Sequence, residues 1–112
     1  MRQRVFDKFN GHCAYCGCEL TIYKMQIDFY LYGKKTDNSF ENLMPSCNLC
    51  FPYKGNMDIE WVRSQLENLI NSCRLHYPYL LAERYGMVEE KQWDGKFYFE
   101  RIKQWQDDRK DN

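Results

Sequence analysis

The sequence lacks the features that define several large classes of protein. It has no net charge, because 16 lysines and arginines balance 16 aspartates and glutamates, and this disfavours duplex DNA bound through phosphate attraction. It has no long apolar run, so we expect no membrane-spanning segment and no membrane partner. Its charged first residues lack the apolar stretch of a signal peptide. These absences predict a cytoplasmic protein.

Low-complexity segments, linkers and internal repeats are also absent from the chain. A chain of 112 residues with 44% hydrophobic and 29% charged residues fits one globular domain, residues 1–112. A domain of this size has a modest core and often needs a staple. The aromatic fraction of 17% suits either a core or an interface that binds a partner.

Cysteine is the residue that could provide such a staple, since the chain has six. In the cytoplasm, cysteines are metal ligands or free thiols more often than disulfides. Four of them form two Cys-x-x-Cys turns, and two such turns complete a closed tetrahedral sulfur site typical of structural Zn²⁺. The predicted ligands are Cys13, Cys16, Cys47 and Cys50. A redox role for either turn would need a surrounding βαβ pattern, which the sequence does not show.

Two cysteines are left over from this pattern. Cys18 lies close to the first turn and could compete as a ligand, but its Cys-x-Cys spacing from Cys16 is less favourable. Cys73 falls on the apolar face of the clearest predicted helix, where we expect it to be part of the core.

Hydrophobic periodicity and turn residues predict the secondary structure. Helices are expected where apolar residues recur every three or four positions, and strands where they alternate. The predicted helices are 2–9, 58–73 and 79–85, with a short one before residue 54, and the predicted strands are 25–32 and 96–100.

The segment between the cysteine turns, together with those turns, resembles the HNH endonuclease family of the zinc-knuckle type. The matching residues, in order, are Asp28 at a strand end, Asn42-Leu43, Pro45, the second Cys-x-x-Cys and Lys54. The resemblance implies an α+β, zinc-stapled ββα-metal fold of treble-clef-like character. Residues 1–57 would hold the zinc knuckles, and residues 58–112 would add C-terminal helices and a short strand.

The departures from the family pattern fall on its chemistry. The resemblance implies a general base at position 29 and a metal-holding residue at position 51, but both are phenylalanine. A phenyl ring neither accepts a proton nor binds Mg²⁺. Asp28 and Asn42 are the remnants of the site, so we expect no catalytic residues and no bound Mg²⁺. His12 adjoins the first cysteine turn and His76 follows the long predicted helix, so we expect neither to reach the position of the base.

Each remaining candidate has two interpretations. Asp28 is either a metal ligand or a solvated carboxylate, and Asn42 is expected to brace a turn. Phe29 and Phe51 either fill the former metal cleft or form an exposed patch that binds a partner. The lysines are either solvated or part of a basic strip that contacts the partner; they are Lys34, Lys35 and Lys54.

Three functions remain open. The first is a catalytically inactive HNH-like protein that binds a protein or RNA partner, such as a phage or mobile-element inhibitor of a host CRISPR-type defence nuclease in the bacterial cytoplasm. Analogy alone suggests that host partner. The second is an active metal-dependent endonuclease that cleaves DNA, and the third is a structural zinc module of a larger complex.

Overall fold

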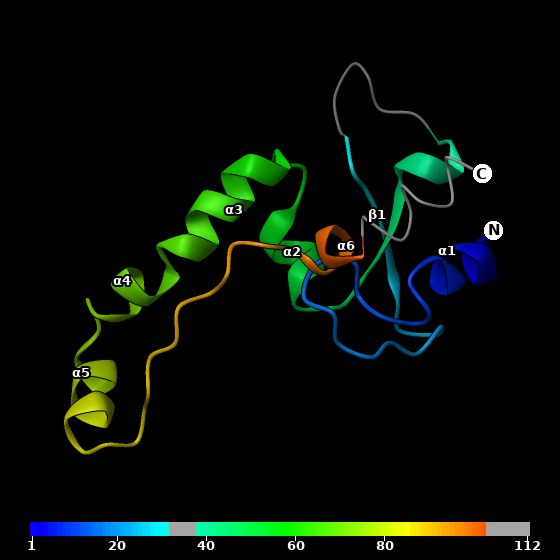
Figure 1. Ribbon diagram of the computed structural model, residues 1–112. Coiled ribbons are helices and arrows are strands. Elements are labelled where there is room, and N and C mark those ends of the chain that lie inside the picture. Colours follow the sequence, from blue (N-terminus) through cyan, green and yellow to red (C-terminus); the bar gives the residue numbers. More distant parts are fainter. Residues whose placement is uncertain (32–37, 103–112) are drawn as a thin grey trace. The chain divides into compact units, whose positions relative to one another are not determined.

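A computed structural model describes residues 1–31 and 38–102 of the chain. The chain forms two compact units (Figure 1). The first comprises Met1–Ile59 and the segment that begins at Lys96, and the second comprises residues 60–95. The first unit is therefore discontinuous in sequence, and the predicted single domain with its division at residue 57 stays a prediction. None of the described helices is long and apolar enough to cross a membrane.

The first unit begins with helix α1 (Arg2–Lys8), close to the predicted 2–9. Its buried residue is Val5, and the chain leaves the helix through Asn10 and Gly11, which both have positive φ. Gly11 donates its N–H to the Phe6 carbonyl at 3.0 Å, a bond that closes the helix end.

A two-stranded antiparallel sheet follows, made of β1 (Gln26–Phe29) and β2 (Leu43–Ser46). The register pairs Ile27 with Pro45 and Asp28 with Met44. The 3-10 helix η1 (Phe40–Asn42) leads directly into β2. Strand β1 is shorter than the predicted strand at 25–32, because residues 30 and 31 already lie in a bend.

The core of the first unit lies where α1 meets the sheet. Buried residues from α1, from β2 and from the position just before β1 form it: Val5, Met25 and Leu43. Partly buried apolar residues pack around them: Phe6, Leu20, Ile27, Phe29 and Phe40. The small size of this core is consistent with a need for additional stabilisation from a staple.

Helix α2 (Cys50–Lys54) begins at the last cysteine of the second turn, as predicted, and ends at Gly55, which has a φ of 54°. Helix α6 (Tyr98–Arg101) stands where the sequence predicted a strand at 96–100, so that prediction was wrong. The Phe97 N–H donates to Glu100 Oε1 at 2.9 Å, and this capping contact begins a helix.

The second unit contains α3 (Ile59–Glu67), which starts at the edge of the first unit, α4 (Leu69–Cys73) and α5 (Tyr77–Arg84). The predicted helix at 58–73 is therefore two helices, separated at Asn68. Asn68 has a φ of −98° and a ψ of 5°, outside the helical values, and is the N-cap of α4, a position at which asparagine is favoured. Pro78 lies in the first turn of α5, where its missing N–H is tolerated.

Candidate metal centre and the adjacent polar site

The four predicted zinc ligands come together. The ligand atoms of Cys13, Cys16, Cys47 and Cys50 all lie within 4.8 Å of one another. Zinc–sulfur bonds of about 2.3 Å place the sulfurs of a tetrahedral site about 3.8 Å apart, and the Cys16 and Cys47 sulfurs are 3.8 Å apart. The donor set and its spacing therefore fit a metal ion such as zinc.

The first knuckle is a tight backbone turn. The Cys13 N–H donates to the Cys18 carbonyl at 2.9 Å, and the Gly17 N–H donates to the Cys13 carbonyl at 3.0 Å. His12 and Glu19 form an antiparallel bridge just outside the turn. Gly17 has a φ of 83°, a conformation that glycine adopts without strain. This turn directs Cys13 and Cys16 to the same side.

The second knuckle joins β2 to α2. The Cys50 N–H donates to Cys47 Sγ at 3.3 Å, and the Phe51 N–H donates to the Cys47 carbonyl at 3.0 Å. Hydrogen bonds to ligand atoms orient them before a metal binds. The Ala14 N–H donates to the Pro45 carbonyl at 2.9 Å, and this bond holds the two knuckles together.

The closeness of the sulfurs moves their pKa values in different directions. The Cys50 thiol donates a hydrogen bond to the Cys13 sulfur, which lowers the pKa of Cys13 to about 4 and raises the pKa of Cys50. Burial raises the pKa of Cys16. Because a metal binds thiolates, its binding releases the remaining protons, and its affinity falls as the pH falls.

The two leftover cysteines have different surroundings. Cys18 is exposed; partial desolvation, together with the nearby Cys16 and Cys47 thiols, raises its pKa to about 12. Cys73 is half-buried in α4 of the second unit.

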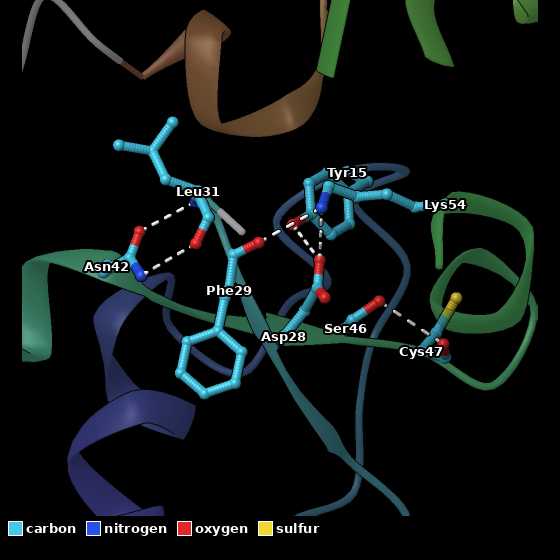
Figure 2. A network of polar contacts seen from close by, with 8 residues as sticks. All are labelled: Tyr15, Asp28, Phe29, Leu31, Asn42, Ser46, Cys47 and Lys54. Atoms are coloured by element: carbon cyan, nitrogen blue, oxygen red, sulfur yellow. Dashed lines mark hydrogen bonds and ion pairs between the residues drawn. The ribbon is translucent and has the colours of Figure 1, made fainter. Parts of the chain in front are cut away.

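A buried ion pair joins strand β1 to helix α2. Asp28 has no exposed surface, and Lys54 Nζ lies 3.2 Å from its Oδ2 atom (Figure 2). The Tyr15 hydroxyl donates a short hydrogen bond to the same oxygen, and Lys54 Nζ also donates to the Phe29 carbonyl at 3.1 Å. The interpretation of Asp28 as a solvated carboxylate was therefore wrong.

Lys54 is also not a solvated surface lysine, since only 1% of it is exposed. Its stem comes from the last turn of α2, and its ammonium lies over the Tyr15 ring at 5.9 Å from the ring centroid. Lys54 is therefore the cation that forms the ion pair with the Asp28 carboxylate. Its expected contact with a partner stays a prediction, and Lys34 and Lys35 lie outside the described residues.

The two phenylalanines occupy different surroundings. Phe29 packs against the core cluster of the first unit, and Figure 2 shows its ring pointing away from the Lys54 ammonium. Neighbouring side chains of a strand point to opposite faces, so Phe29 and Asp28 do not share a face of β1. Phe51 lies half-buried in the first turn of α2.

Asn42 braces the turn before β2, as expected. Its side-chain oxygen accepts the Leu31 N–H at 2.8 Å, and its amide donates to the Leu31 carbonyl at 3.2 Å (Figure 2). These two bonds extend the pairing of the strands beyond β1. Asn42 is 7% exposed, so it acts as a structural connector.

The histidines have other neighbours. The His12 ring stacks on Tyr98, with centroids 5.5 Å apart, and His76 precedes α5 in the second unit. Sequence reasoning missed Tyr15 as a partner of Asp28. Tyr15 lies between Cys13 and Cys16 in the sequence, and a zinc knuckle fixes the direction of the side chains within it. This position was the one indication that Tyr15 has a fixed partner.

Comparison of the chain with models of known protein families, with curated proteins and with solved structures finds no match. The described residues form a small α+β protein with a two-stranded sheet, helices and a four-cysteine cluster compatible with zinc. The resemblance to HNH endonucleases stays a prediction.

Proposed function

We propose that this chain is a zinc-stabilised module that binds a protein partner and does not cleave nucleic acid. The HNH-like arrangement, with its expected base and metal ligand replaced by Phe29 and Phe51, belongs to this proposal. Zinc at the four cysteines acts structurally, because four sulfur ligands leave no open position for a substrate.

The observation that carries the proposal is the buried contact of Asp28 with Lys54 and Tyr15. An HNH-like site would need the Asp28 carboxylate to hold a divalent metal. Magnesium requires several oxygen ligands and keeps bound water, but Asp28 has no exposed surface and faces an ammonium group. A cation at this carboxylate would either displace Lys54 and leave its buried ammonium without a counter-ion, or bury a second positive charge beside it, and both are unfavourable.

A protein partner is favoured by the surface of the second unit. Val62 is the only buried residue in the segment 60–95, whereas eight large apolar residues there are at least 41% exposed. They are Trp61, Leu69, Leu75, Tyr77, Leu80, Leu81, Tyr85 and Met87. Exposed apolar surface of this kind is typical of protein-binding sites, and the chain's zero net charge offers little attraction for nucleic acid.

Helix α5 presents the clearest part of this surface. Tyr77 and Leu81 are four residues apart and therefore lie on the same helix face. They are 71% and 41% exposed. A short helix with such a stripe suits an apolar groove of another protein. A host CRISPR-type defence nuclease, suggested by analogy with phage inhibitors, is one such partner.

Catalysis is tested by incubating the zinc-loaded chain with duplex DNA, single-stranded DNA and RNA in Mg²⁺ and in Mn²⁺. Asp28→Asn serves as the matched variant. We expect neither protein to cleave any substrate. Metal-dependent cleavage by the natural chain that Asp28→Asn abolishes would favour the active-endonuclease alternative.

Reversion of the two phenylalanines sharpens this assay. We expect Phe29→His with Phe51→Asn to remain inactive, because Lys54 still holds Asp28 in that variant. Cleavage by this double variant, with none by the natural chain, would show that Lys54 does not block the site.

Binding is tested with the zinc-loaded chain as bait in a lysate of its host. We expect a protein to be retained at high salt by the natural chain and by the exposed control Arg84→Ser, and to be lost with Tyr77→Ser plus Leu81→Ser. Salt-sensitive retention of RNA would overturn the choice of a protein partner. If the chain folds only in a complex with permanent subunits, this result would favour the alternative in which it is a structural zinc module of a larger complex.

A further inference from the structure

The chain segment that follows α5 and leads to Lys96 has an unpaired backbone. Residues 88–92 lie in neither a helix nor a strand, and within the described part of the chain they make no hydrogen bond through a backbone group. Figure 1 shows them in the yellow-to-orange path after α5, which contains no helix. Unpaired N–H and C=O groups along an extended segment are a template for pairing with another chain.

Side chains from α3, α5 and the end of α4 hold this segment in place. The Glu90 carboxylate accepts hydrogen bonds from the Tyr79 hydroxyl at 2.7 Å and from Arg74 Nε at 3.1 Å. Further along, the Gly95 carbonyl accepts a hydrogen bond from the Arg63 guanidinium. The segment therefore keeps a fixed position in the second unit while the backbone groups of residues 88–92 stay unpaired.

Exposure alternates along the segment. Val88 and Glu90 are half-buried, whereas Glu89 and Lys91 are exposed. Alternation with a period of two is typical of an extended chain, in which successive side chains point to opposite faces. The N–H and C=O groups of such a chain point sideways, towards a neighbouring strand. Because Glu90 faces its own helices, these backbone groups lie along the surface, where another strand can reach them.

We infer that residues 88–92 pair with the same segment of a second copy of this chain, as an antiparallel ribbon centred on Glu90. In this arrangement Glu89 of each protomer lies opposite Lys91 of the other. The contact occurs twice, as in other twofold dimers, and opposite charges across two strands stabilise their pairing. The inference goes beyond the proposed function, since it concerns a contact between two copies and not the α5 surface.

The charges select both the second copy and the register. Within the described part of the chain neither Glu89 nor Lys91 forms an ion pair. A lysine on an exposed edge normally opposes pairing with another strand, but here it meets a glutamate. The next registers that keep the same faces together place Glu89 opposite Glu89, or Lys91 opposite Lys91, and like charges repel there. The two central Glu90 carboxylates are each paired with Arg74 of their own chain.

The first experiment measures the dimerisation constant by sedimentation equilibrium of the zinc-loaded chain. We expect the natural chain to dimerise reversibly, and more weakly at high salt. Glu89→Lys and Lys91→Glu should each weaken dimerisation about tenfold, because each change turns both charge contacts from attraction to repulsion. Arg84→Glu reverses the charge of another exposed residue and is the control, which should dimerise like the natural chain.

Mixing the two variants makes this test specific. We expect an equal mixture of Glu89→Lys and Lys91→Glu chains to form a heterodimer about as strong as the natural dimer, because the two lysines of one chain then meet the two glutamates of the other. The double variant Glu89→Lys plus Lys91→Glu should also regain dimerisation. A variant that had failed to fold could not be rescued by mixing. Absence of rescue in both cases would overturn the inference.

Amide exchange at low and high protein concentration locates the interface. We expect protection of residues 88–92 to rise with concentration. A chain that stays monomeric, or a dimer in which these amides stay unprotected, would overturn the inference. Protection that arises only in a complex with a different protein would overturn the choice of a second copy. A natural chain that dimerises but retains no protein from a lysate would contradict the proposed function and leave this inference intact.

Discussion

Lys54 Nζ lies 3.2 Å from Asp28 Oδ2, and neither side chain is more than 2% exposed. The contact joins the last turn of α2 to β1 through two buried charges. A buried ion pair contributes little net stability over apolar residues, but removal of one partner leaves an uncompensated charge. The pair therefore fixes the position of α2 on the sheet, next to the cysteine cluster that α2 helps to form.

Lys54→Met should destabilise the zinc-loaded protein by about 3–5 kcal/mol, because it leaves Asp28 buried without its cation. Urea unfolding measures this change. Asp28→Leu plus Lys54→Met should cost less than the sum of the two single changes. The exposed Lys24→Met is the matched control and should have little effect. Additive costs would argue against a direct pair.

Tyr15→Phe should destabilise the protein by about 1.5–3 kcal/mol, the usual contribution of a hydrogen bond to a charged group. It removes the hydroxyl that donates to Asp28 and leaves the ring in place. Tyr23 is 92% exposed, so Tyr23→Phe should leave the urea midpoint unchanged. Equal midpoints for both variants would show that the Tyr15 hydroxyl is not an important donor.

Gly17→Ala should cost more stability than Gly86→Ala, although both glycines have positive φ. Alanine in this conformation costs about 1–2 kcal/mol at either position. At Gly17 the added Cβ would also lie 2.6 Å from the Tyr98 ring, whereas no atom lies within 4 Å at Gly86. Thermal unfolding of the two variants compares the costs, and a larger loss at Gly86 would contradict the described packing of α6.

The second unit should respond to pH through Glu83 and Glu90. The Arg74 guanidinium and the Tyr79 hydroxyl hold the pKa of Glu90 at about 2, and a hydrogen bond with Glu90 raises the pKa of Glu83. Because the pKa of Glu83 is raised in the folded state, protonation of Glu83 stabilises the fold as the pH falls towards 4.5. Because the pKa of Glu90 is lowered, protonation of Glu90 removes stability as the pH falls from about 4.5 to about 2. The protection of the α5 amides, which compares their exchange rate with that of an unstructured peptide at the same pH, should therefore rise and then fall on acidification.

Glu83→Gln tests the first half of this response. It removes the titrating group, so the rise in protection in mild acid should disappear while the loss of protection towards pH 2 remains. Glu89→Gln changes an exposed neighbour of Glu90 and should keep both phases. Persistence of the rise in protection in Glu83→Gln would assign it to another residue.

Local features of this fold were predictable, whereas contacts between distant residues were not. The cysteine turns, the Asn10-Gly11 helix end and α2 depend on spacing within a few residues, and the structure confirms them. The strand predicted at 96–100 failed because a run of three aromatics is typical of a strand, although Glu100 caps a helix there. The break at Asn68 was missed because the apolar spacing continues across it.

The partners of Asp28 could not be predicted because they depend on tertiary packing. Tyr15 comes from the first knuckle and Lys54 from α2. These side chains meet only once both knuckles gather at one point, and no local pattern encodes that meeting. The same reasoning applies to Phe29, whose direction depends on which face of β1 covers the core.

The central claim is that a metal held by four cysteines stabilises the first unit. Native mass spectrometry combined with amide exchange before and after chelation tests it most directly. We predict one zinc per chain, and we predict that chelation exposes the amides of β1 and β2 to rapid exchange, because structural zinc contributes about 10–16 kcal/mol in comparable small domains. A chain that carries no zinc, or whose strands stay equally protected without it, would contradict the claim.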